Sequence, residues 1–134
     1  MRNKLFIINV VFLSVVAAEI RNVSVNGSDS NGDGTESSPF ATIQAGINKS
    51  LSSDTVLVGP GTYNQQIDYK GKQIIVMSTS GADSTVIYST NNNVSFNTQE
   101  GSSAVLDGFT LTGSSEYGIY MDSYSKPTLR NLVI

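Results

Sequence analysis

Short apolar segments separated by turn residues dominate the chain from Asp54 onward. The breakers between them are rich in Gly, Pro, Asn and Ser, as in Gly59-Pro60-Gly61. No second long helical pattern intervenes, which excludes a sheet built from alternating strands and helices. We therefore predict short strands over residues 55–58, 73–77, 85–88, 94–96, 104–106, 109–112, 118–121 and 128–134.

One helical pattern precedes these strands. Its apolar residues recur at spacings of three and four along one face, at Phe40, Ile43, Ile47 and Leu51. Ser38 followed by proline is typical of an N-cap with proline at the first helical position. The pattern predicts a helix of about three turns that lies across the open end of the strands and buries its apolar stripe there.

Internal repetition decides how the strands are arranged. Val56 and Ile75 lie 19 residues apart, and a 23-residue spacing pairs Leu106 with Leu129, Phe109 with Leu132 and Leu111 with Ile134. Repeats of this length with short strands are typical of stacked coils. We predict an all-β fold, a right-handed parallel β-helix with an N-terminal capping α-helix and about four coils.

The first 18 residues have the features of a secretory leader. Arg2 and Lys4 precede an apolar run over residues 5–16, and small residues stand before a cut between Ala18 and Glu19. The run is shorter than the roughly 20 residues that a membrane-spanning helix needs. We expect residues 1–18 to be removed and the product to be secreted, periplasmic or attached to the cell surface, with no membrane span.

The end of the chain also bears on its organisation. Residue 134 falls inside a predicted coil strand, with no polar cap after it. Solenoids need a capped end, because a bare last coil leaves an apolar face and an unpaired edge. We therefore expect the chain to be truncated, as the N-terminal portion of a longer protein.

Two segments together resemble a known family. Residues 39–47, Pro-Phe-Ala-Thr-Ile-Gln-Ala-Gly-Ile, and residues 54–63, Asp-Thr-Val-Leu-Val-Gly-Pro-Gly-Thr-Tyr, are similar to the opening of bacterial parallel β-helix proteins of the pectin-lyase-like superfamily. In these proteins such segments form an N-terminal loop with a capping helix, and then the first coil. The resemblance implies a loop and capping helix over 19–53 and coils over 54–134. It does not fix an activity.

Composition narrows the chemistry. The chain contains no Cys and no His, so thiol chemistry, disulfides and histidine-based catalysis are excluded. Without the leader, the chain keeps 6 basic residues against 11 acidic ones. Nucleic acid is therefore not an expected partner, because a basic face is needed to neutralise phosphates. Catalysis would have to use Asp, Glu, Lys, Arg or Tyr.

One loop has the spacing of a calcium site. Asp29, Asn31 and Asp33, followed by Gly34, match the alternating oxygen ligands of a calcium loop. Position twelve of the loop is Phe40 where such loops carry a bidentate glutamate. A solvated loop of Asx turns is the alternative that we favour over a calcium cofactor.

A charged pair is predicted on neighbouring coils. The 23-residue repeat sets Asp107 beside Arg130. The resemblance implies that an enzyme of this superfamily would use a Lys or Arg base together with carboxylates, often with calcium. The pair then belongs either to a substrate groove or, as we favour, to an exposed ladder of charges worth under about 1 kcal/mol.

Aromatic and acidic residues gather in one segment. Glu116, Tyr117, Tyr120, Asp122 and Tyr124 stand within nine residues of one another. Tyrosine rings offer apolar faces to sugars, and acids accept hydrogen bonds from sugar hydroxyls or act in glycosidases. The alternative is a tyrosine-rich turn, half buried between two strands.

These observations predict an exported β-helix module that forms the N-terminal part of a larger polysaccharide-interacting protein. Two alternatives remain open. One is a polysaccharide lyase or glycoside hydrolase with most of its active site downstream, and the other is a non-catalytic, adhesin-like or structural surface protein.

Overall fold

The structure of the chain is a computed structural model that describes residues 3–13, 15–122 and 124–134. Within these residues the chain forms one short helix, α1 (Ile43–Lys49), and eleven strands. The strands are β1 (Ile20–Val23), β2 (Thr55–Val58), β3 (Gly61–Asn64), β4 (Ile67–Asp68), β5 (Ile75–Ser78), β6 (Thr85–Tyr88), β7 (Val94–Phe96), β8 (Val105–Asp107), β9 (Thr110–Thr112), β10 (Ile119–Met121) and β11 (Thr128–Arg130).

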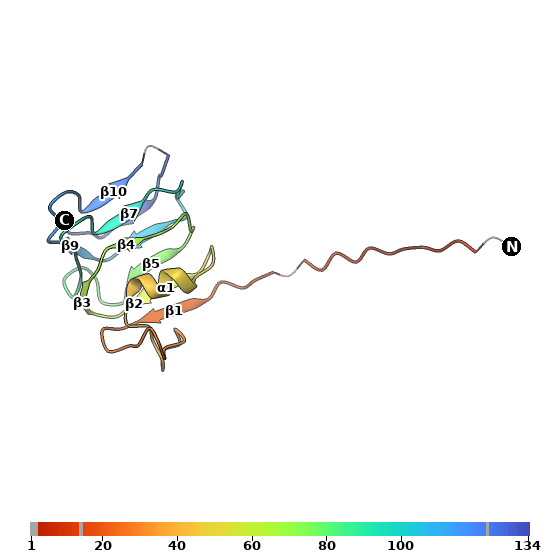
Figure 1. The fold of residues 1–134 in the computed structure, drawn as a ribbon, viewed down its shortest axis with the longest axis horizontal. Helices are drawn as coiled ribbons and strands as arrows, with labels where there is room; N and C mark the ends of the chain where they lie inside the picture. The colour runs from red at the N-terminus through yellow and green to blue at the C-terminus, as the bar shows by residue number, and fades with distance from the viewer. Residues whose placement is uncertain (1–2, 14, 123) are drawn as a thin grey trace.

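The strands stack into a parallel β-solenoid, as predicted (Figure 1). Three sheets run along it, in the orders β1-β2-β5-β8-β11, β3-β6-β9 and β4-β7-β10. Every strand pairing in these sheets is parallel. Each turn of the solenoid contributes one strand to each sheet, which gives about three complete turns. The prediction of about four coils was too high, because β1 and β11 belong to turns that lack the other two strands.

The register agrees with the 23-residue repeat. Leu106 pairs with Leu129 and Asp107 pairs with Arg130, in parallel. An isolated parallel bridge continues the same spacing to Thr110. The 19-residue repeat was wrong by one position, because Val56 pairs with Val76, 20 residues later.

The core lies inside the three sheets, where side chains from successive turns stack on one another. Val56, Val76 and Leu106 form one buried row along the five-stranded sheet. Phe96 and Phe109 are fully buried, and the ring of Phe96 packs against Tyr69 at a centroid distance of 4.3 Å. The burial of Phe109 confirms the predicted coil register. Apolar side chains removed from water are the main stabilising contribution in such a core.

Helix α1 is shorter than predicted and begins later. Its N-cap is Thr42, whose side-chain oxygen accepts a hydrogen bond from the Ala45 N–H, and not Ser38. Phe40 lies outside the helix because it forms a parallel bridge with Val23 of β1. Leu51 follows the helix and is exposed. Backbone pairing with β1 therefore overrides the local Ser-Pro signal, and the apolar face of the helix reduces to Ile43 and Ile47.

The helix covers the N-terminal end of the solenoid, next to β1, β2 and β4 (Figure 1). The Gln44 side chain occupies the free edge of β4: its amide donates to the Asp68 carbonyl at 3.1 Å and accepts from the Asp68 N–H at 2.8 Å. At the other end of the helix, Lys72 Nζ donates to the carbonyls of Ile47, Asn48 and Ser50. Both arrangements satisfy backbone groups that an open end would leave unpaired.

The predicted leader forms no helix or strand in its described part. Residues 3–13 and 15–18 are exposed and extend away from the solenoid (Figure 1). Among the described residues, no helical segment combines the length and the hydropathy that a membrane crossing requires. Removal of residues 1–18 stays a prediction.

Candidate functional site

Two tyrosines of the predicted aromatic cluster lie together on the surface. Tyr117 precedes β10 and Tyr120 lies within it, and their rings are 6.1 Å apart at an interplanar angle of 47°. Tyr117 is 58% exposed and Tyr120 40% exposed. Tyr120 alternates along the strand with Ile119 and Met121, and it pairs with Ser95 of β7. The pair presents aromatic surface that nothing in the described chain covers.

A third exposed tyrosine, which sequence reasoning missed, lies one turn earlier. Tyr88 ends β6, is 41% exposed, and borders a shallow hollow of about 210 Å³ lined also by Asn64, Gln65, Ser89 and Thr90. Its ring lies directly over Gly113, where a Cβ atom would come within 2.4 Å of it. Gly113 has a φ of 85°, so a side chain there would strain the backbone as well. The glycine thus allows the tyrosine ring to lie flat against the next turn.

Hydrogen bonds join the two regions into one corner of the solenoid. The Ser115 N–H and hydroxyl both donate to the Thr90 carbonyl, and the Asn93 N–H donates to the Tyr117 carbonyl. Buried Asn93 also donates through its side-chain amide to the Ile87 and Thr112 carbonyls, one in each turn. We call Tyr88, Ser89, Thr90, Tyr117 and Tyr120 the corner surface.

The other members of the predicted cluster have different surroundings. Glu116 is exposed next to Tyr117. The Asp122 carboxylate accepts hydrogen bonds from the N–H groups of Tyr124 and Ser125 and from the Ser125 hydroxyl. The Ser125 hydroxyl and the Tyr124 N–H hold the pKa of Asp122 below its ordinary value. Tyr124 is 73% exposed beyond the far end of β10, and it is absent from the ring contacts that the described residues make.

Asp107 and Arg130 lie side by side, as the repeat predicts. Arg130 Nη2 is 3.3 Å from Asp107 Oδ2, and the Arg130 side chain is about half exposed. Asp107 Oδ1 also accepts a hydrogen bond of 2.7 Å from the Asn131 side chain. The arrangement is that of a surface charge ladder on the outer face of the five-stranded sheet. Such exposed pairs contribute little to stability.

The residues of the predicted calcium loop bond within the protein. Asp29 Oδ1 accepts from the N–H groups of Ala41 and Thr42, and Asp29 Oδ2 accepts from the Thr42 hydroxyl. Burial acts to raise the pKa of Asp29, but these hydrogen bonds outweigh it and the pKa is lowered. Asp29 therefore fixes the entry to helix α1.

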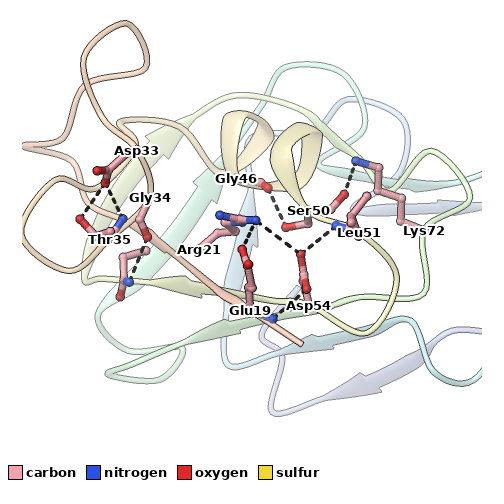
Figure 2. Close-up of polar contacts among 11 residues, drawn as sticks. Glu19, Arg21, Asp33, Gly34, Thr35, Gly46, Ser50, Leu51, Asp54 and Lys72 are labelled. Carbon is pink, nitrogen blue, oxygen red and sulfur yellow. Dashed lines mark hydrogen bonds and ion pairs between the residues drawn. The ribbon is translucent and has the colours of Figure 1, made fainter. Parts of the chain in front are cut away.

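Asp33 and Asn31 complete that loop. Asp33 Oδ1 accepts from the Thr35 hydroxyl and N–H, which lower the pKa of Asp33 (Figure 2). The Asn31 N–H donates to the Ser28 hydroxyl. No group of three or more His, Cys, Asp or Glu side chains suited to a metal ion occurs within residues 3–13, 15–122 and 124–134. The loop is thus built from Asx-type turns, and its geometry adds no support to the calcium prediction.

A buried carboxylate that the sequence did not reveal joins three turns of the solenoid. Glu100 is fully buried, and its oxygens accept from the Gly71 N–H at 2.8 Å, the Thr98 N–H at 2.9 Å and the Ser125 hydroxyl at 2.9 Å. Burial acts to raise the pKa of Glu100, but the hydrogen bonds lower it overall. The nearby Tyr69 hydroxyl donates to the Val105 carbonyl at 2.6 Å, and burial together with Glu100 raises the pKa of Tyr69. With no exposed surface, Glu100 has a structural role.

A larger hollow of about 430 Å³ lies between the N-terminal loop and the outer face of β1 and β2. Its floor includes Ile20 and Leu57, and its rim includes Glu36 and Pro39. Glu36 is the one charged residue in this lining. The hollow lacks the basic and acidic groups together that general acid–base chemistry would use.

Comparison with known proteins identifies a family but no characterised relative. Residues 25–134 match the sequence profile of the family described as protein of unknown function (DUF1565). No curated protein and no solved structure gave a significant match. Because the profile covers most of the chain, including every turn of the solenoid, this chain belongs to the DUF1565 family.

Proposed function

We propose that this chain is an exported β-solenoid module that binds polysaccharide through the corner surface. The observation that carries the proposal is the exposed ring pair of Tyr117 and Tyr120, next to the hollow that Tyr88 borders. Large aromatic residues exposed close together are typical of binding sites, because each costs free energy to keep in water.

The chemistry of the hollow supports a sugar ligand. Sugar rings combine C–H faces, which pack on tyrosine rings, with hydroxyl groups that need hydrogen-bond partners. Beside Tyr88, the lining supplies two amide and two hydroxyl side chains, those of Asn64, Gln65, Ser89 and Thr90. These groups both donate and accept, as hydroxyl recognition requires.

Charge favours an uncharged polysaccharide over a polyuronate. None of the residues that line the hollow carries a charge, and the residue beside Tyr117 is acidic. Arg130 is paired with Asp107, and Lys72 donates to three carbonyls at the end of helix α1. A carboxylated polymer would therefore meet Glu116 without a compensating cation in the corner surface.

Affinity electrophoresis in gels that contain a neutral or an acidic polysaccharide tests the proposal. We expect a neutral glucan or mannan to retard the chain, and the double variant Tyr117→Ala, Tyr120→Ala to bind roughly tenfold more weakly. Tyr124→Ala is the matched control, because it removes an equally exposed tyrosine from the far end of β10. Equal retardation of all three proteins, or of none by any polymer, would contradict the proposal.

The same polysaccharides also test the enzymatic alternative. Release of reducing ends, or of unsaturated uronate absorbing in the ultraviolet, would indicate a hydrolase or a lyase. We expect neither product, because the corner surface binds without a pair of carboxylates placed across it. Cleavage by the chain would replace the binding proposal with a catalytic one.

A further inference from the structure

The backbone nitrogen of Glu19 lies against a buried carboxylate. Its N–H donates to Asp54 Oδ1 at 2.8 Å, and Asp54 is only 2% exposed (Figure 2). Asp54 Oδ2 accepts from the Leu51 N–H at 2.8 Å, and the Thr55 N–H donates to the Glu19 carbonyl. The predicted cut between Ala18 and Glu19 would thus create the new chain end at this carboxylate.

Order in the chain begins at the same position. Residues 15–18 are exposed and form no element, whereas β1 starts at Ile20 and its pairing with β2 continues the contact of Glu19. The buried apolar core likewise starts beyond this point, at Val23. Removal of the leader therefore leaves the packing of the solenoid intact.

The charges around this point are unbalanced. Arg21 forms ion pairs with the Glu19 carboxylate and, at 4.0 Å, with Asp54 Oδ2. Two carboxylates thus share one guanidinium, and the buried Arg21 Nε has no hydrogen-bond partner among the described residues. Lys72 is the next nearest cation, and it contributes its hydrogen bonds to the end of helix α1. One further positive charge at the Glu19 nitrogen would balance the group.

We propose that Asp54 is a binding site for the α-ammonium group that leader cleavage creates at Glu19. A peptidase adds one water across the Ala18–Glu19 peptide bond: the Ala18 carbonyl becomes a carboxylate, and the Glu19 nitrogen becomes an ammonium. A neutral N–H···carboxylate bond is thereby replaced by a charge-assisted one between the same two atoms. The new pair fixes β1 at the edge of the five-stranded sheet, and processing stabilises the fold.

The inference rests on the predicted cleavage position, and N-terminal sequencing of the exported protein checks that position separately. A chain that begins at Glu19 is expected. A start several residues away would overturn the inference, because the ammonium would then lie outside hydrogen-bond reach of Asp54.

Urea unfolding of two processed forms tests the binding site itself. One form begins at Glu19, and the other keeps Ala18, which moves the ammonium one residue, about 3.8 Å, along the chain. We expect the unfolding equilibrium constant to be roughly tenfold smaller for the form that begins at Glu19, because hydrogen bonds to charged partners are stronger than neutral ones. Equal midpoints for the two forms at pH 7 would overturn the inference.

The pH dependence of this difference provides a control that needs no substitution. An α-ammonium paired with a carboxylate has a raised pKa, so its contribution is complete below about pH 8 and is lost as pH rises through the folded value. Glu19 and Asp54 stay ionised there and Arg21 stays charged, while Lys72 titrates equally in both forms. A difference unchanged up to pH 11 would contradict the assignment, and so would one that persists in Asp54→Asn.

Discussion

Replacement of Glu100 tests how the turns of the solenoid are held together. Glu100 lies in the loop before β8, yet its carboxylate accepts hydrogen bonds from Gly71 in the turn below and Ser125 in the turn above, besides Thr98 in its own loop. One side chain therefore joins three turns at a single corner. We expect its loss to weaken the stacking of all three.

The expected magnitude follows from the bonds that are lost. Glu100→Ala leaves the N–H groups of Gly71 and Thr98 without their acceptor, and hydrogen bonds to a charged group contribute about 1.5–3 kcal/mol each. Because water enters part of the space that is vacated, we expect a loss of about 3–5 kcal/mol, a large share of the roughly 5–15 kcal/mol of a typical domain. Glu100→Gln keeps one acceptor oxygen, and its loss should be about 1–3 kcal/mol.

Urea unfolding followed by circular dichroism measures these losses, with Glu116→Gln as the control because Glu116 is exposed. The folded pKa of Glu100 is lowered from 4.5, so its contribution is present above that value and is lost as pH falls through the folded pKa. Glu100→Gln should therefore lessen the destabilisation of the chain below about pH 4.5. If Glu100→Ala unfolds at the same urea concentration as the parent, the three-turn contact does not stabilise the fold.

Three further substitutions probe the core, the surface ladder and the covered end. Phe109→Asp places an unpaired charge in the core and should prevent folding, observed as loss of the β-sheet circular dichroism signal; a folded variant would refute the coil register. Arg130→Ala should change the unfolding free energy by under about 1 kcal/mol, and a larger loss in urea would show that its pairing with Asp107 is more than a surface ladder. Gln44→Ala exposes the Asp68 edge of β4 and should cost about 1–3 kcal/mol, with faster amide hydrogen exchange at Asp68; unchanged exchange would contradict the edge-covering role.

Much of the fold could be predicted because the signals are local and repeated. The predicted strands over 55–58, 85–88 and 94–96 match β2, β6 and β7, whose β-branched and aromatic residues alternate between core and surface. Strand β3 was missed because it begins with a glycine directly after Gly59-Pro60, and of its four residues only Tyr63 is buried. Turn chemistry thus concealed a strand that tertiary pairing with β6 stabilises.

The helix start and the functional residues depend on contacts between turns, which a linear pattern does not contain. Asp29 bonds the N–H groups of Ala41 and Thr42, twelve and thirteen residues away, and this long-range contact moves the helix cap to Thr42. Tyr88 joins the corner surface only because the turns that follow it stack on one another. Glu100 has the composition of a solvated turn residue, so its burial becomes visible only once three turns are superimposed.

Amide chemical shift mapping tests the proposed binding surface most directly. The isotope-labelled chain is titrated with oligosaccharides of the neutral polymer that retards it most strongly, and the backbone amide signals are followed. We predict that the signals that move belong to the corner surface and to its neighbours Asn64, Gln65 and Gly113, with those of β2 and β5 unchanged. Movement confined to the outer face of the five-stranded sheet, around Asp107 and Arg130 or the hollow below the N-terminal loop, would contradict the account, as would no movement at all.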